Sequence, residues 1–440
     1  MTSHHGDMVQ ATVLADIALV LVVGVVLLRA ARFVRQPAVV GEILAGIALG
    51  PSLLGLLPGD LTDRIFPVEA RPFLSAISQI GLLLFMFVLG WELDPRHLRG
   101  SKRAVAAVSA GSIIVPFALG IAAAAAVYQQ HATVAGKQVD FWVFALYLGI
   151  AMSVTAFPVL ARILADGGLG STRVGTLALA SAALGDVIAW CLLAIVMGLA
   201  AAGGGAGGFA AIIGWSVAYV IVMGVLVRPL LGKLTAQLLR RGGAAQLASV
   251  IAAGALLSSY ATSLIGIHPI FGAFAFGIVM PRQPWRELEP LVQRPLQGVA
   301  RLLLPVYFIV TGLSVNVGDL HGRDWLDLAL LLTVACVGKV VGATFPAKWT
   351  GLPWRDALGV GILMNTRGLT ELIILNVGLS LKVLDGRLFT VMVLVALFTT
   401  AIAGPFLPFL VKKPQADIAP VPAMPRTEHL ESDNAPVPSR

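Results

Sequence analysis

Long apolar segments separated by short polar ones occupy almost the whole chain. A helix that crosses a lipid bilayer needs about 20 mostly apolar residues, and thirteen segments approach or exceed this length. The pattern predicts an all-α polytopic membrane protein with about 13 transmembrane helices. The predicted spans are residues 11–30, 37–57, 73–93, 104–127, 141–165, 175–199, 208–232, 244–264, 266–281, 298–317, 326–347, 356–380 and 388–411.

The composition agrees with a membrane location. Of the 440 residues, 58% are hydrophobic and only 12% are charged, and the mean hydropathy is +0.89. Because a soluble domain usually has about 25% charged residues, this excludes an ordinary cytosolic enzyme, a nucleic-acid-binding domain and a disordered chain. Cys191 and Cys336 lie in apolar segments and form neither a disulfide framework nor a metal motif. We expect no cofactor.

The basic residues are distributed unevenly between alternate loops. With the N-terminus placed outside, the inner loops and the C-terminal tail hold 23 Lys and Arg residues, and the outer loops hold 6. Basic residues concentrate on the cytoplasmic side of membrane proteins, so the N-terminus is predicted to be outside and the C-terminus cytoplasmic. The net charge of +8 then faces the anionic inner leaflet, and it requires no nucleic-acid partner.

The end of the chain differs from the rest. Residues 414–440 are polar and contain six prolines, a composition typical of a disordered tail. No glycine-rich nucleotide fingerprint follows the last span, so we expect no nucleotide-binding regulatory domain in this chain.

Two predicted spans contain residues that interrupt a helix. In the fifth span, Pro158 lacks a backbone donor and disfavours a helical conformation at Phe157. In the twelfth span, Asn365, Thr366 and Gly368 lie near the middle. Irregular backbone at that depth is tolerated where it is buried in protein or lines a water-filled cavity. These residues predict two discontinuous helices.

The two interruptions lie seven spans apart, and an odd number of spans reverses the orientation of the chain. Spans 1–6 and 8–13 are therefore interpreted as two inverted six-helix repeats with crossed discontinuous helices, joined by span 7. Paired broken helices in corresponding positions are typical of the binding site of a secondary transporter.

One carboxylate lies near the middle of the sixth span. Asp186 follows Gly185 in an otherwise apolar segment, where a charged group is costly. Burial disfavours the charged form of a carboxyl group, and carboxylate oxygens are also suitable ligands for hard cations. Asp186 is therefore predicted to bind either a proton or a monovalent cation, which is the minimum requirement for exchange.

Four other ionisable groups within predicted spans are further candidates for a role in transport. Lys339 in the eleventh span is expected either to offset helix C-terminal dipoles at the crossing or to pair with Asp186. Arg367 and Glu371 are spaced i, i+4 in the twelfth span and are expected to pair with each other or with dipole ends. Glu42 in the second span is a candidate for a water path.

Four segments resemble motifs of the second monovalent cation:proton antiporter family, in particular its Kef-type and plant cation/H⁺ exchanger branches. Residues 153–165 resemble the fifth-helix signature, and residues 181–190, which include Asp186, resemble the ion-carboxylate helix. Residues 267–274 and 364–372 resemble two further motifs. The resemblance covers about residues 12–411.

This resemblance implies alternating access, in which a core domain moves against a dimerisation scaffold, and a homodimer. It also implies that Asp186 binds the ion together with Thr155 and Ser181, and that Lys339 is the cationic partner. The transmembrane domain would comprise residues 1–413, with the core at about 104–199 and 326–411 and the scaffold at about 11–93 and 208–317.

Two departures from the family pattern matter. Electrogenic members have two adjacent acidic residues where this chain has Gly185 and Asp186, so we expect 1:1 electroneutral exchange. Kef-type efflux proteins carry a nucleotide-binding regulatory domain, which is not expected here, so gating by nucleotides is not expected either.

The leading hypothesis is a non-enzymatic antiporter in the cell membrane that exchanges K⁺ or Na⁺ for H⁺ without ATP. A cation channel is an alternative, but no selectivity loop is apparent. An intramembrane enzyme would need a metal motif or a Ser–His pair at depth, and an organic-anion or bile-acid symporter of related fold is disfavoured by the motifs. Residue types do not indicate which cation is carried.

Overall fold

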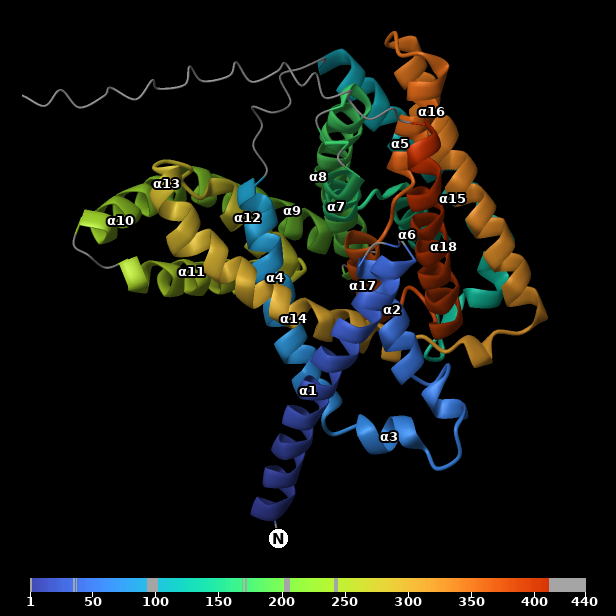
Figure 1. Cartoon of the computed structure of the whole chain (residues 1–440), viewed down its shortest axis with the longest axis horizontal. Coiled ribbons are helices and arrows are strands. Elements are labelled where there is room, and N and C mark those ends of the chain that lie inside the picture. The colour runs from blue at the N-terminus through green and yellow to red at the C-terminus, as the bar shows by residue number, and fades with distance from the viewer. Residues whose placement is uncertain are drawn as a thin grey trace, which may run out of the picture.

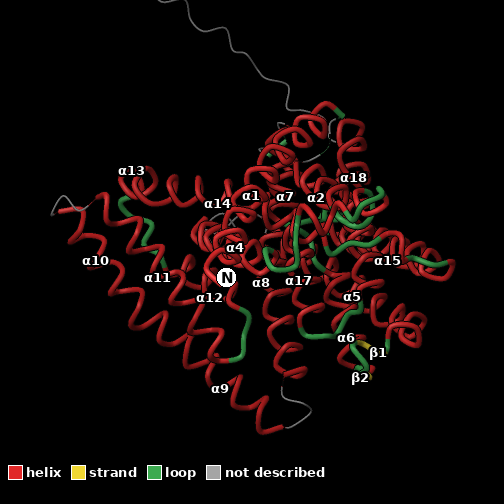
Figure 2. Tube along the Cα trace, turned by 90° about the horizontal axis from the view of Figure 1, so that it is seen from below, coloured by secondary structure: helices red, strands yellow, loops and turns green. Residues whose placement is uncertain are grey.

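The computed structural model of the chain describes residues 2–34, 36, 38–92, 102–167, 169–170, 172–201, 206–240 and 244–410. Nearly all of these residues are helical (Figure 2). The strands in this part of the chain are β1 (Thr133–Val134) and β2 (Lys137–Gln138), which form one antiparallel hairpin. The predicted tail, 414–440, lies outside the described residues.

The helices follow the predicted order. In the first half of the chain they are α1 (Thr2–Phe33), α2 (Ala38–Leu49), α3 (Leu61–Ile65), α4 (Arg71–Glu92), α5 (Lys102–His131), α6 (Phe141–Ser153), α7 (Phe157–Gly167), α8 (Arg173–Ala201) and α9 (Ala206–Val222). They continue with α10 (Arg228–Arg240), α11 (Ala244–Ile265), α12 (Pro269–Val279), α13 (Trp285–Leu288), α14 (Arg294–Leu313), α15 (Gly322–Trp349), α16 (Trp354–Met364), α17 (Leu369–Ser380) and α18 (Gly386–Leu410).

Short irregular helical turns join some of these elements. They are the 3₁₀ turns η1 (Leu54–Leu56) and η5 (Val317–Asp319) and the π-helical segments η3 (Met223–Val227) and η4 (Glu289–Gln293). Because η3 continues α9 directly into α10, the seventh span extends to Arg240 rather than ending at the predicted residue 232.

Each predicted span overlaps one or more consecutive helices in the described part of the chain, although α2 ends at Leu49, eight residues before the predicted end of the second span. The fifth span is α6 and α7, separated by residues 154–156, and the twelfth is α16 and α17, separated by residues 365–368. The all-α architecture with two discontinuous helices is therefore confirmed. Among the described residues, eight helical segments are long and apolar enough to cross a membrane by themselves, and shorter apolar helices such as α6 and α12 accompany them.

The helices form two groups in Figure 1. Helices α5–α8 and α15–α18 lie together on the right, whereas α9–α13 extend to the left. Helix α14 packs against α2 and α4, and α12 packs against α4 and α11. The crossing of the two broken helices lies within the first of these groups, since α6, α7, α16 and α17 all belong to it.

Helices α5 and α15 approach each other closely at glycines. A Cβ placed on Gly342 would lie 2.4 Å from the carbonyl oxygen of Gly111, and one on Gly338 would lie 2.9 Å from Cα of Pro116. Small residues allow helix backbones to touch in membranes, where van der Waals packing drives helix association. This contact joins the fourth and eleventh spans, which are the equivalent helices of the two predicted repeats.

The outer surface of the left-hand group is apolar. Within the segment Ala210–Arg240, only 6% of the most apolar stretch of 18 residues is buried. Val225 in η3 is 74% exposed. Such a surface would be unfavourable in water, but it is suited to lipid tails or to a second protein surface. The exposed apolar side chains thus support the membrane location that the composition indicates.

Candidate functional site

The two helix breaks meet in space. Val154 has an extended backbone after α6, and the amide of Ala156 donates a hydrogen bond to the carbonyl oxygen of Thr366 at 3.0 Å. The Thr155 hydroxyl donates to the carbonyl oxygen of Met364, the last residue of α16, at 2.8 Å. Because unpaired backbone groups are costly in a membrane, each break stabilises the irregular backbone of the other.

The break between α16 and α17 depends on a glycine and on a neighbouring helix. Gly368 has a φ of 155°, which residues with a side chain rarely adopt. The Thr400 hydroxyl of α18 accepts a hydrogen bond from the amide of Arg367 at 2.9 Å and donates one to its carbonyl oxygen at 2.6 Å. A single side chain therefore satisfies both backbone groups of the central residue of this break.

Two basic side chains bind the C-terminal end of α6. The Arg367 guanidinium donates to the carbonyl oxygens of Ala151 at 2.9 Å and Met152 at 2.7 Å. Lys339 of α15 donates to the carbonyl oxygen of Ser153 and, at 2.6 Å, to the Thr155 hydroxyl. The last carbonyl groups of a helix have no partner within it and carry partial negative charge. Of the two roles considered for Lys339, these contacts correspond to the offset of a helix dipole.

Arg367 also pairs with Glu371. Their side chains are both fully buried, and the guanidinium lies 2.6 Å from Oε1 of Glu371 one turn later in α17. A buried charge is tolerated when it is paired and hydrogen-bonded. With Lys339 and Asp186 ionised as well, the two cationic and two anionic side chains at the crossing balance in charge.

Asp186 belongs to α8, and its carboxylate lies beside the N-terminal end of α7. One carboxylate oxygen, Oδ2, accepts a hydrogen bond from the amide of Phe157, the first residue of α7, at 3.2 Å. The N-terminus of a helix favours a negative charge. The side chain is only 2% exposed, and the other oxygen, Oδ1, has no hydrogen-bond partner among the described residues. A buried oxygen that the protein leaves without a partner can accept a proton or coordinate a cation.

The other residues predicted for the site lie on α7, in the second break, on α8 and on α2. Pro158 is the second residue of α7, in the first turn, where a missing donor costs nothing. Asn365 and Thr366 lie in the break itself, and Oδ1 of Asn365 has no hydrogen-bond partner among the described residues. Ser181 is fully buried on α8, and its hydroxyl also has no hydrogen-bond partner among the described residues. Glu42 is half-buried on α2, which packs against α1 and α14.

The structure also places polar residues that the sequence analysis did not single out. Thr400 has no distinguishing sequence signal, because threonine is common in apolar helices and often bonds to its own backbone. Asp16 does have one, since it is a carboxylate within the first predicted span. Its side chain is 3% exposed on α1, and Oδ2 has no hydrogen-bond partner among the described residues.

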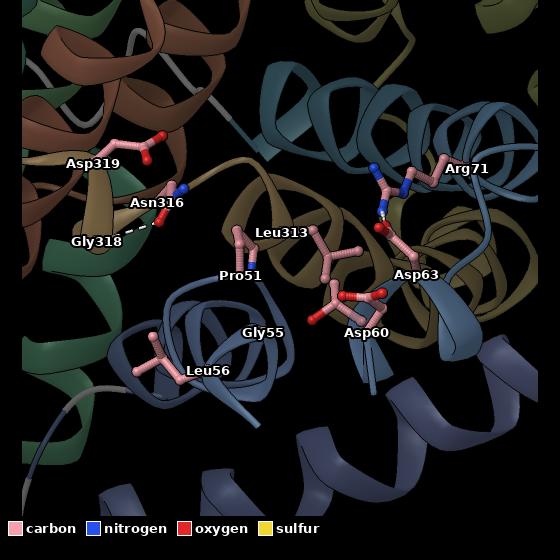
Figure 3. A pocket seen from close by; sticks show the side chains of 11 residues that line it. Pro51, Gly55, Leu56, Asp60, Asp63, Arg71, Leu313, Asn316, Gly318 and Asp319 are labelled. Carbon is pink, nitrogen blue, oxygen red and sulfur yellow. Dashed lines mark hydrogen bonds and ion pairs between the residues drawn. The ribbon is translucent and has the colours of Figure 1, made fainter. Parts of the chain in front are cut away.

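One cavity lies away from the crossing. It measures about 470 Å³ and lies between the loop after α2 and the end of α14. Figure 3 shows Asp60, Asp63 and Arg71 along one side of it, with Asp63 and Arg71 joined by an ion pair at 2.5 Å, and Asn316 on another side. None of the site residues predicted from the sequence lines this cavity, so it is a separate surface feature.

The Thr155 hydroxyl offers a direct test of the contacts at the crossing. We expect Thr155→Val to lower the free energy of unfolding by about 1–3 kcal/mol, because the change removes the bond to Met364 and one acceptor for buried Lys339. Thr155→Ser keeps the hydroxyl and should lose much less. Denaturation of the purified variants in detergent measures both values, and a valine variant as stable as the serine variant would contradict these contacts.

Comparison with known proteins gives a consistent result. The family model described as "Sodium/hydrogen exchanger, transmembrane" matches residues 17–413. The chain is 40% identical to the Na(+)/H(+) antiporter NhaS4 of Synechocystis over 404 residues, covering 90% of this chain and 96% of that protein. It is also 40% identical to Cation/H(+) antiporter 20 of Arabidopsis thaliana over 385 residues, covering 84% of this chain and 45% of that protein.

The chain therefore spans nearly all of the cyanobacterial relative but about half the length of the plant one. Among solved structures, that of the sodium proton antiporter MjNhaP1 from Methanocaldococcus jannaschii is similar, with a TM-score of 0.66 at 14% identity, covering 91% of this chain and 96% of that one. At this identity the likeness concerns the fold, and it confirms the predicted class of architecture.

Proposed function

The chain belongs to the sodium/hydrogen exchanger family, and from that premise we propose that it is a secondary antiporter that exchanges a monovalent cation, K⁺ or Na⁺, for H⁺. The observation that carries the proposal is Asp186, whose oxygen Oδ1 is buried beside the crossing without a hydrogen-bond partner among the described residues. The relatives named above are antiporters rather than enzymes, and no cofactor is needed for the exchange.

Asp186 acts as the exchange group. A proton and a cation compete for the same carboxylate, so that binding of one releases the other. The Thr155 hydroxyl donates one hydrogen bond and accepts one, which leaves a lone pair for a cation. Ser181 has a buried hydroxyl on the same helix that is unpaired among the described residues. It lies five positions before Asp186, or roughly 140° around the helix, so its contribution is the weaker one.

Lys339 and Arg367 hold the crossing together while the ion changes. Their contacts with the carbonyl groups of residues 151–153 do not involve the Asp186 carboxylate. Transport then requires the helices around the crossing, at about 104–199 and 326–411, to move against a scaffold formed by about 11–93 and 208–317. In Figure 1 helices α9–α13 lie apart from α5–α8 and α15–α18, which supports placing α9–α13 outside the core.

One carboxylate per exchange site determines the stoichiometry. Because Gly185 provides no second acidic group, one proton is exchanged for one monovalent cation and no net charge moves. We therefore expect the initial rate of exchange in proteoliposomes to be the same with and without a membrane potential. A thiocyanate gradient of either direction imposes the potential without adding a competing cation.

The measurement follows the internal pH of the vesicles after addition of Li⁺, Na⁺, K⁺ or Rb⁺, which also identifies the cation. A rate that increases with one polarity and decreases with the other would contradict the 1:1 stoichiometry. Vesicles without protein, given the same gradient, correct for passive proton leakage.

In the cell the protein is proposed to span the plasma or inner membrane, with the N-terminus outside and the C-terminus in the cytoplasm. The support is the asymmetry of 23 against 6 basic residues between the two sides. It is further proposed to form a homodimer through helices of the scaffold. The apolar surface of α9, η3 and α10, which other helices leave largely uncovered, supports such a contact.

A further inference from the structure

A second cluster of buried ionisable groups lies outside the crossing, where α5 ends and α15 and α18 begin. His131 is the last residue of α5, and Asp324 and Asp327 lie in the first two turns of α15. Asp385 immediately precedes α18. Helices α5, α15 and α18 run side by side on the right of Figure 1. The side chains of His131 and Asp324 are 0% and 1% exposed, and that of Asp327 is 8% exposed.

The ring of His131 is oriented by Asp385. Its Nδ1 lies 2.9 Å and 3.0 Å from the two carboxylate oxygens of Asp385. Since an ionised carboxylate only accepts hydrogen bonds, Nδ1 carries the proton. The other ring nitrogen, Nε2, faces Oδ2 of Asp327 at 3.4 Å. A carboxylate that holds one imidazole nitrogen while the other faces further carboxylates is the arrangement found around histidine ligands of metals.

The cluster has more acceptors than donors. Asp324 uses Oδ2 to accept from the amide of His321 at 2.8 Å. Its Oδ1 is buried and has no hydrogen-bond partner among the described residues. Arg387 is 41% exposed and lies 3.8 Å from this Oδ1 of Asp324 and 3.8 Å from Oδ2 of Asp385, so it compensates the three carboxylates only in part. The remaining negative charge favours a bound cation.

The ligand atoms are close enough for one ion. One potential ligand atom from each of His131, Asp324 and Asp327 lies within 4.8 Å of the other two. Bonds of about 2.0–2.2 Å to Zn²⁺ bring ligand atoms about 3.3–3.6 Å apart in a tetrahedron, a distance that small side-chain rotations achieve. An imidazole with two carboxylates suits a transition metal better than Mg²⁺ or Ca²⁺, which prefer oxygen ligands alone.

We propose that His131, Asp324 and Asp327 bind a Zn²⁺-type divalent transition-metal ion, and that Asp385 positions the His131 ring for it. Either a water molecule or His321 completes the coordination. His321 is exposed, and its Nδ1 lies 4.0 Å from Oδ2 of Asp324. The ion joins the end of α5 to the start of α15, the two helices that contact each other through Gly111 and Gly342. The site shares no residue with the crossing around Asp186.

The test measures Zn²⁺ binding to the full-length protein in lipid nanodiscs after treatment with a chelator. The protein carries no histidine tag, and His4 and His5 are replaced by glutamine because adjacent histidines bind metals by themselves. Titration against a fluorescent chelator should give one Zn²⁺ per chain, which excess Mg²⁺ does not displace. His131→Gln and Asp327→Asn should each weaken binding at least 100-fold, and Asp385→Asn by about 10- to 100-fold.

Asp63→Asn is the matched control, because Asp63 is an ion-paired carboxylate outside the cluster, and this variant should bind Zn²⁺ like the parent protein. X-ray absorption at the zinc edge of the parent protein needs no variant and should show one imidazole ligand, or two if His321 binds, with oxygen ligands completing the shell at about 2.0–2.2 Å. The proposal is overturned if no stoichiometric Zn²⁺ is found, if His131→Gln retains it, or if the coordination shell contains oxygen alone.

Discussion

Asp186→Asn is expected to abolish cation-dependent proton exchange, reducing the rate at least 100-fold to that of protein-free vesicles. Asparagine keeps the shape of the side chain and an oxygen that can accept from the amide of Phe157. It removes the charge and the ability to bind a proton, so neither exchanged ion has a site. The measurement is cation-driven collapse of a pH gradient in proteoliposomes.

Asp16→Asn is the control for this experiment. Asp16 is also a buried carboxylate within a membrane helix, with one oxygen unpaired among the described residues, but it lies on α1 and not at the crossing. The Asp16 variant should retain exchange, and both variants should elute as folded protein on gel filtration. Exchange that persists in a folded Asp186→Asn variant would show that another group binds the ions.

Arg367→Met is expected to have the largest effect on stability, lowering the free energy of unfolding by about 3–5 kcal/mol. Removing one member of a buried ion pair leaves the other charge unpaired in a low dielectric. In this protein Glu371 would lose its cationic partner, and the carbonyl groups of Ala151 and Met152 would lose their donors. Denaturation in detergent, monitored by tryptophan fluorescence, measures the loss.

Two further variants complete this test: one removes the unpaired charge, and the other breaks an exposed ion pair for comparison. In Arg367→Met combined with Glu371→Gln the unpaired charge is absent, so part of the lost stability should return. Arg71→Ala breaks an ion pair whose members are 41% and 66% exposed, and exposed pairs contribute about 1 kcal/mol or less. If Arg367→Met were no more damaging than Arg71→Ala, the buried pair would not stabilise the crossing.

The positions of the helices and of their interruptions could be predicted from the sequence because both depend on local properties. A long apolar segment is stable as a helix in lipid whatever its neighbours are. The interruptions follow from residues whose own chemistry opposes a helix, with Pro158 at the start of α7 and Gly368 in the second break. The end of the seventh span was predicted too early, because the polar residues near Arg240 continue the helix beyond the apolar segment.

The partners of the charged residues could not be predicted in this way. Lys339 could have paired with Asp186 or with a helix end, and in the folded chain it binds Ser153 and Thr155. Thr400 satisfies the backbone of Arg367 without any sequence signal. His131 and Asp385 are 254 residues apart in the chain.

The sequence by itself determined the membrane class, the helix order, the location of the breaks and the residue types available for exchange. These depend on the transfer of local segments from water to lipid and on the conformational preferences of single residues. The tertiary structure alone decided that one oxygen of Asp186 remains without a partner among the described residues beside the crossing, and that a histidine and three carboxylates meet at the ends of α5, α15 and α18. Such contacts join segments far apart in the chain, and only the packing of whole helices against one another brings them together.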